Sequence, residues 1–270
     1  MRWHAYPENW AGTGGRPRTL IVYFPYEASL VRDVAQPIPN YISWPDERII
    51  RDFSRLSALG VDGILVGIRP GDSVDRFRAE RYERLFELVV RHSDWPRIAF
   101  WICPEPGVEA RRCSLFVDWL TDMLVQYNVA YYQVEARALV VLSPLYTEWP
   151  VHHPALDLRF TARNRGQWNW QPRTPKQLAE SESSDQLVVY AGYLESLREG
   201  HAQWAIPRRG GRTVVESFRN AVESAPGIIC ISSWNDYAEG SFVEPNTLDG
   251  SRVYDLLRRE IRAFRTAAKR

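Results

Sequence analysis

The sequence predicts an α/β fold, in the form of a single-domain (β/α)8 TIM barrel. Short apolar runs, each typical of a buried strand, alternate with amphipathic segments of helical period, which gives about eight strands. Continuous apolar strands separated by helices indicate a parallel sheet with both faces covered. The 270 residues suit one barrel of this kind, and no linker rich in Pro, Gly or Ser divides them. A doubly wound parallel sheet is the alternative.

The expected strands are short runs of Ile, Val, Leu and aromatic residues. An N-terminal arm with several Gly and Pro residues is expected over 1–18, and the barrel over 19–270. The strands are expected at 19–24, 62–68, 97–103, 138–143, 156–161, 186–191, 202–206 and 227–233.

The expected helices carry their apolar residues on one face. Ile49, Phe53 and Leu56 follow one another at spacings of four and three, which places them on one side of the first helix. Ser43 is its expected N-cap, and Gly60 is expected to end it. The helices are expected at 45–59, 78–92, 114–126, 213–223 and 251–268. The last of them combines an apolar stripe with an Arg-rich outer face, as expected for a helix packed on a barrel.

Composition and charge exclude several classes of protein. With 45% hydrophobic and 25% charged residues, the chain is not disordered, collagen-like or a coiled coil. The net charge of +1 creates no field that would recruit nucleic acid or an anionic membrane. No apolar run approaches the roughly 20 residues of a membrane span, and the first residues lack the apolar core of a signal peptide. We therefore expect a cytoplasmic protein with no nucleic-acid or membrane partner.

Nothing in the sequence requires a metal or a cofactor. Cys103, Cys113 and Cys230 are too few and too far apart for a disulfide framework or a metal site. The five His residues lack metal-ligand spacing. The Gly-rich segment 12–15 precedes the first strand instead of following it, so it is not a phosphate-binding loop.

The last expected strand leads into two acidic residues, Asp236 and Glu239, three positions apart. In a barrel, reacting groups lie at the carboxyl ends of the strands. Two neighbouring carboxylates in a half-buried site push their pKa values apart, so that one stays protonated while the other is ionised. Hydrolysis of an acetal needs this division of roles. The alternative is structural: Asp236 caps a turn, and Glu239 pairs with an arginine.

Other strand ends offer aromatic and polar side chains that suit a sugar. An aromatic ring stacks on the apolar face of a sugar, and a place in the core is the alternative for each ring. Asn235 is expected to fix the carboxylates or a sugar hydroxyl, and Arg208 is a further possible contact. The candidate substrate-binding residues are Tyr23, Trp101, Glu105, Arg163, Trp168, Trp170, Trp234, Asn235 and Glu244.

Residues 232–245 read SSWNDYAEGSFVEP. This stretch resembles the signature of the glycoside hydrolase family 99-like group, (S/T)-(F/W)-N-E-W-(H/A)-E-G followed by E-P. The Asn-Asp-Tyr-x-Glu variant is also similar to family 71, the fungal α-1,3-glucanases. Weaker agreement occurs in the same order along the chain, at 132–141, 168–170, 209–221 and 250–257.

The resemblance implies a (β/α)8 barrel that cleaves α-linked glycans or glycoconjugates with retention of configuration. It implies that Asp236 acts as base on the sugar's own 2-hydroxyl, forming an epoxide-like intermediate. Glu239 is then the general acid/base at the glycosidic oxygen. The sequence departs from family 99 at Asp236, which is one methylene shorter than the family's Glu. Ala238 stands where the endo-mannosidases have His. Mannosidase specificity is therefore not implied.

Two further functions remain open from the sequence. The short Asp236 and the short chain also suit a degenerate barrel that binds carbohydrate without cleaving it, or an accessory protein of polysaccharide biosynthesis. A barrel lyase or isomerase would need a metal or a Schiff-base Lys. The chain has only Lys176 and Lys269, neither at a strand end, which disfavours the Schiff base. The oligomeric state is not indicated.

Overall fold

The computed structural model describes residues 17–25, 35–39, 44–73, 75–103, 110–142, 154–160, 186–195, 203–224, 226–237 and 239–267. Its centre is an eight-stranded sheet in which, as far as these residues show, only the two-residue β4 (Gln133–Val134) runs antiparallel to its neighbour. The parallel strands lie in the order β7 (Gln186–Tyr190), β10 (Ile228–Ser232), β1 (Arg18–Tyr23), β2 (Gly63–Ile68), β3 (Arg97–Ile102), β5 (Arg137–Leu142) and β6 (Leu156–Phe160). The expected α/β fold with a parallel sheet is thereby confirmed.

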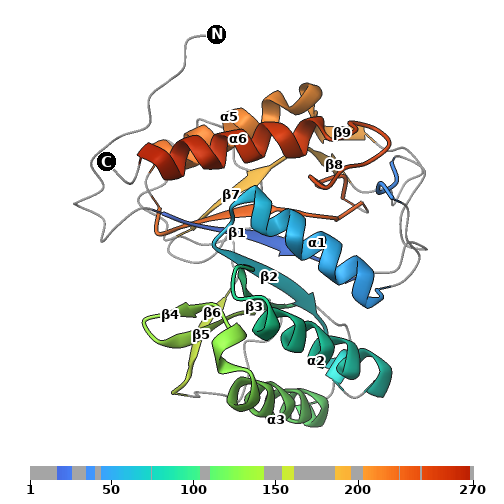
Figure 1. Ribbon diagram of the computed structural model, residues 1–270, viewed down its shortest axis with the longest axis vertical. Helices are drawn as coiled ribbons and strands as arrows, with labels where there is room; N and C mark the ends of the chain where they lie inside the picture. Colours follow the sequence, from blue (N-terminus) through green and yellow to red (C-terminus); the bar gives the residue numbers. More distant parts are fainter. Residues whose placement is uncertain are drawn as a thin grey trace.

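The helices pack on one face of this sheet (Figure 1). They are α1 (Asp46–Leu59), α2 (Arg76–Arg91), α3 (Ala110–Gln126), α5 (Arg212–Glu223) and α6 (Arg252–Ala267). Buried residues of all five helices form one apolar cluster with alternate strand residues such as Ile21. Leu20, Val22 and Phe24 point to the other face, where the described members of a second cluster come from strands and loops and not from helices. Helices on a single face disfavour the doubly wound alternative, which covers both.

The two ends of the sheet are β7 and β6. Within the described ranges no strand pairing joins them, and the intervening residues 161–185 lie outside those ranges. The structure therefore establishes a parallel sheet with helices on one face, and a complete eight-stranded barrel is not established.

The expected strand at 202–206 is present as β9 (Gln203–Ile206), but it is not a strand of the parallel sheet. It pairs antiparallel with β8 (Tyr193–Glu195) in a separate two-stranded sheet. Only residues 196–202 connect the two strands. A parallel connection needs a crossover of about a dozen residues or more, so this short link produces a hairpin.

The boundaries of other elements differ from the expected ones by a few residues. α2 begins at Arg76, because the Asp75 side chain accepts a hydrogen bond from the Arg78 N–H (3.2 Å) and caps the helix. α3 begins at Ala110, four positions before the expected start. Gly60 ends α1 as expected, with a φ of 91° that favours glycine. The expected cap Ser43 and most of the N-terminal arm lie outside the described residues.

The last strand and the last helix occupy the middle of the fold. β10 pairs with β1 on one side and β7 on the other. α6 packs against both α1 and α5 (Figure 1). The segment that follows β10 therefore leaves the carboxyl edge of the sheet near its centre. Within the described part of the chain, no helix has the length and apolar character to cross a bilayer.

Candidate active site

The carboxyl end of β10 leads into a closed turn, residues 233–242, which we call the β10 turn; its Ala238 is not described. The Trp234 N–H donates to the Val22 carbonyl (2.7 Å) and continues the pairing with β1. The Ser233 N–H donates to the Ser241 carbonyl (2.6 Å), and the Ser241 N–H donates to the Asp236 carbonyl (3.1 Å). Main-chain bonds thus fix both arms of the turn beside the end of β1.

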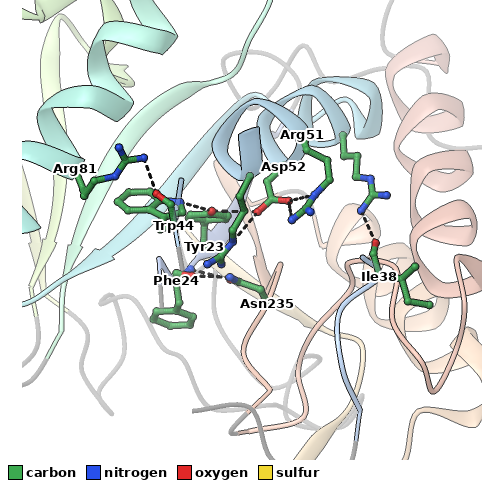
Figure 2. A network of polar contacts seen from close by, with 10 residues as sticks. Tyr23, Phe24, Ile38, Trp44, Arg51, Asp52, Arg81 and Asn235 are labelled. Carbon is green, nitrogen blue, oxygen red and sulfur yellow. Dashed lines mark hydrogen bonds and ion pairs between the residues drawn. The ribbon is translucent and has the colours of Figure 1, made fainter. Parts of the chain in front are cut away.

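Asn235 ties this turn to the residue that follows β1 (Figure 2). Its side-chain oxygen accepts from the Phe24 N–H (2.8 Å), and its amide nitrogen donates to the Phe24 carbonyl (2.5 Å). Asn235 is buried. The amide of Asn235 therefore binds the main chain of Phe24. Because Asn235 directly precedes Asp236, these bonds hold the turn next to the first carboxylate.

Asp236 and Glu239 lie on the same turn, where the side chain of Asp236 contacts the main chain of Glu239. The Asp236 carboxylate accepts from the Glu239 N–H (3.1 Å), and the Asp236 N–H donates to the Ser233 hydroxyl (2.7 Å). Asp236 thus caps the turn, as the structural alternative expects. The second half of that alternative is not seen: the Glu239 side chain is exposed, and no described arginine forms an ion pair with it.

The electrostatic setting of Glu239 suits proton transfer. Glu239 is exposed as a whole residue, yet enough protein surrounds its carboxyl group for burial to raise its pKa to about 7. The negative charge of Asp236 raises this pKa further. A carboxyl group with a pKa near neutrality can give up a proton in one step and recover it in the next.

Tyr190 is a neighbour of this pair that sequence reasoning missed. It ends β7, lies opposite Ser232 in the sheet register and is buried. Burial raises the pKa of its phenol well above the ordinary value, and the charges of Glu239 and Asp236 add to that shift. The signal available in the sequence was its place at the end of an expected strand.

Two expected substrate contacts, Tyr23 and Trp234, are corrected by their burial. Tyr23 and Trp234 have no exposed surface. Tyr23 lies under α1, where its hydroxyl donates to Asp52 (3.2 Å) and accepts from the Trp44 indole N–H (2.7 Å) (Figure 2). Neither ring presents a face on which a sugar could stack.

Glu244 is also buried, with 1% of its surface exposed. Its N–H donates to the Trp234 carbonyl (3.0 Å). Burial is the main cause of the raised pKa of Tyr23, and the charge of Glu244 contributes to it, so this carboxylate lies towards the interior near Tyr23. The expectation of a direct substrate contact by Glu244 is not supported by this position.

Trp101 has a more open position. It is the last but one residue of β3 and lies on the same face of the sheet as Phe24, with the two ring centres 5.5 Å apart. It is half-buried, and it remains a candidate for contact with a ligand. Four further candidates lie outside the described residues: Glu105, Arg163, Trp168 and Trp170.

No protein-family model and no curated protein matches the sequence. Among solved structures, the chain is similar to the GH99 endo-α-mannosidase of Bacteroides thetaiotaomicron in complex with bis-tris propane. The TM-score is 0.69 at 15% identity, over 94% of this chain and 99% of that one. A second structure of this enzyme gives 0.69 at 14% identity, over 93% and 98% of the two chains. A glycoside hydrolase-like protein gives 0.61 at 11%, over 97% of each chain. These likenesses show a shared fold, and they confirm the family 99-like resemblance at that level.

Proposed function

We propose that this protein is a glycoside hydrolase that cleaves α-linked glycans or glycoconjugates, with Asp236 and Glu239 as its catalytic pair. One observation carries the proposal: Glu239 is accessible at the carboxyl edge of the sheet, beside a second carboxylate, with its pKa raised to about 7. The shared fold with a GH99 endo-α-mannosidase supports the same class of reaction.

We further propose that the sheet is part of a complete (β/α)8 barrel. Support comes from the apolar strand face opposite the helices, which suits the interior of a barrel. In such a barrel Trp101, Glu105, Arg163, Trp168 and Trp170 belong to the open end that holds Glu239, and there they would contact the sugar.

The proposed reaction proceeds with retention in two steps. Glu239 donates its proton to the glycosidic oxygen as that bond breaks. Asp236 accepts the proton of the sugar's 2-hydroxyl, whose oxygen attacks the anomeric carbon and forms an epoxide-like intermediate. Glu239, now ionised, then takes a proton from water, and the hydroxide opens the intermediate at the anomeric carbon while Asp236 returns its proton to the 2-oxygen. A pKa near 7 suits Glu239 to both of its roles.

A second function is favoured by the bond between Asp236 and the Glu239 N–H. A carboxylate that caps a turn has a structural reason to be present, and Asp236 is shorter than the family 99 Glu. In this case the protein binds carbohydrate without cleaving it, alone or as an accessory to polysaccharide synthesis.

The test is hydrolysis of α-mannosyl and α-glucosyl oligosaccharides by the wild type and by the variants Glu239→Gln and Asp236→Asn. Each variant should keep the fold and lose at least about 100-fold in kcat. The wild-type rate should fall above pH 7, as Glu239 loses the proton that it donates. Glu223→Gln, on the exposed last residue of α5, is the control and should keep full activity. Full activity in either site variant would contradict the proposal, and tight binding without cleavage by the wild type would favour the second function.

A further inference from the structure

A buried arginine from a different loop holds the β10 turn. Arg208 lies just before α5, and its guanidinium donates to the carbonyls of Gly240 (3.0 Å) and Phe242 (2.9 Å). Its side chain is only 5% exposed. The expectation that Arg208 contacts substrate is corrected by this position, because these donors are directed to main chain.

Asp249 and an aromatic stack fix the arginine in turn. Arg208 donates to the Asp249 carboxylate through Nε (2.8 Å) and lies within 2.6 Å of it through Nη2. The guanidinium also lies 4.2 Å from the ring centre of Phe242, which stacks on Tyr237 at 4.3 Å. A planar group with five donors can satisfy two carbonyls, a carboxylate and a ring face together, whereas the point charge of Lys cannot.

The two fixed ends of the turn flank the two carboxylates. Gly240, whose carbonyl Arg208 binds, directly follows Glu239 in the chain. Asn235, which binds Phe24, directly precedes Asp236. Burying a charged pair is costly, and apolar side chains of similar volume would often stabilise the loop as well. Apolar side chains could not donate to the two carbonyls, however, so the main chain on the two sides of the carboxylates depends on Arg208 and Asn235.

We propose that Arg208, anchored by Asp249, is a positioning residue that holds the peptide after Glu239 and so sets the place of the Glu239 carboxyl group. The proposal rests on the proposed function only for its effect on rate. Its effect on the surroundings of Glu239 can be measured whether or not the protein hydrolyses a glycan.

The pKa of Glu239 indicates whether the β10 turn keeps its position. Partial burial and the nearby Asp236 raise the pKa of Glu239 to about 7 from an ordinary value near 4.5. In the described part of the chain, Asp236 on the same turn and Tyr190 from β7 are the titratable groups that interact with it. If the turn loosens, Glu239 gains water, and its pKa should fall towards the ordinary value.

The experiment is a carbon-13 NMR titration of the glutamate carboxyl groups, with the Glu239 signal assigned from Glu239→Gln. It compares the wild type with Arg208→Lys, Arg208→Gln and Asp249→Asn. Arg219→Lys is the matched control, because Arg219 forms a bidentate pair with Glu260 (2.8 and 2.9 Å) between α5 and α6, away from the turn. Asp249→Asn is the mildest change, since it leaves both carbonyl bonds of Arg208 in place, and it decides the matter if the Arg208 variants do not fold.

The proposal expects the titration midpoint of Glu239 to fall by a pH unit or more in the Arg208 variants, to fall less in Asp249→Asn, and to stay in place in Arg219→Lys. It also expects kcat to fall by about 10- to 100-fold in the Arg208 variants with little change in KM. An unchanged midpoint in folded Arg208 or Asp249 variants overturns the proposal. A wild type that hydrolyses nothing, while the midpoint still responds to Arg208, overturns the proposed function and leaves the positioning role supported.

Discussion

At the scale of single residues, the raised pKa of Glu239 links its protonation to the stability of the fold. The unfolded chain holds this proton with a pKa near 4.5, and the folded protein holds it with a pKa of about 7. Between these values the unfolded state releases its proton first. The contribution to stability is therefore fully present below pH 4.5 and is lost as the pH rises to about 7.

Glu239→Gln should remove this dependence. We expect the free energy of unfolding of the wild type to fall, relative to that of the variant, between pH 4.5 and 7 and to change no further above that range. Urea denaturation at pH 4.5, 5.5, 7 and 8 measures the difference. Asp236→Asn removes the negative charge that helps to raise the pKa of Glu239. The pH range over which the stability falls should therefore be narrower in this variant. If the free energy of unfolding depended on pH in the same way in the wild type and in Glu239→Gln, the raised pKa of Glu239 would be contradicted.

The position of a single residue could be predicted from the sequence only where the pattern indicates to which face of the sheet its side chain points. Asp236 and Glu239 follow an unmistakable strand, so their place at its carboxyl end was predictable. Tyr23 was expected to face the sugar but lies under α1, because neighbouring residues of a strand point to opposite faces. Every residue from Leu20 to Phe24 is buried, and a run apolar on both faces carries no signal of which residue faces which side.

At the scale of elements, β2 depends on two glycines on the face of the sheet opposite the helices. A Cβ at Gly67 would lie 2.6 Å from the Phe24 ring, and one at Gly63 would lie 2.6 Å from the Tyr132 ring. Both contacts are too short for a real side chain, so each position requires glycine for close packing.

Gly67→Ala should disturb the site, and Gly63→Ala should not. Each substitution should cost about 1–3 kcal/mol of unfolding free energy through overpacking. Gly67→Ala pushes on Phe24, whose main chain Asn235 binds, so kcat should also fall by about tenfold or more. Gly63 lies at the opposite end of β2 and serves as the control. Denaturation and hydrolysis assays of both variants test this, and equal activity in the two would contradict it.

The elements that sequence reasoning located well are those with a complete local signal. α1 has its apolar stripe and the terminating Gly60, and it was placed within a residue. β8 was not predicted, and β9 was expected in the parallel sheet, because the partner of a strand depends on the length of its connection and on the neighbouring chain more than on composition. The contacts of Arg208 with Asp249 and Gly240 were not predicted either, because these residues are distant from Arg208 in the sequence.

At the scale of the whole molecule, the end of the chain holds the start in place. β10 lies beside β1, and α6 packs between α1 and α5. The Tyr254 hydroxyl of α6 donates to the Arg55 carbonyl of α1 (3.0 Å), and the Arg219–Glu260 pair joins α6 to α5. Since α6 contacts α1 near the start of the sequence and α5 near its end, loss of one of its contacts should weaken the fold as a unit.

Arg219→Ala tests this coupling. Glu260 is almost fully buried, so removing its bidentate partner leaves a desolvated carboxylate between two helices. We expect a loss of about 3 kcal/mol in unfolding free energy. The control is Arg76→Ala, which breaks the Arg76–Glu80 pair on the exposed side of α2 and should cost no more than about 1 kcal/mol.

Because α6 contacts helices from both ends of the chain, circular dichroism and Trp fluorescence should still report one shared transition at a lower urea concentration. Two separate transitions would show instead that α5 and α6 unfold independently of the rest of the sheet.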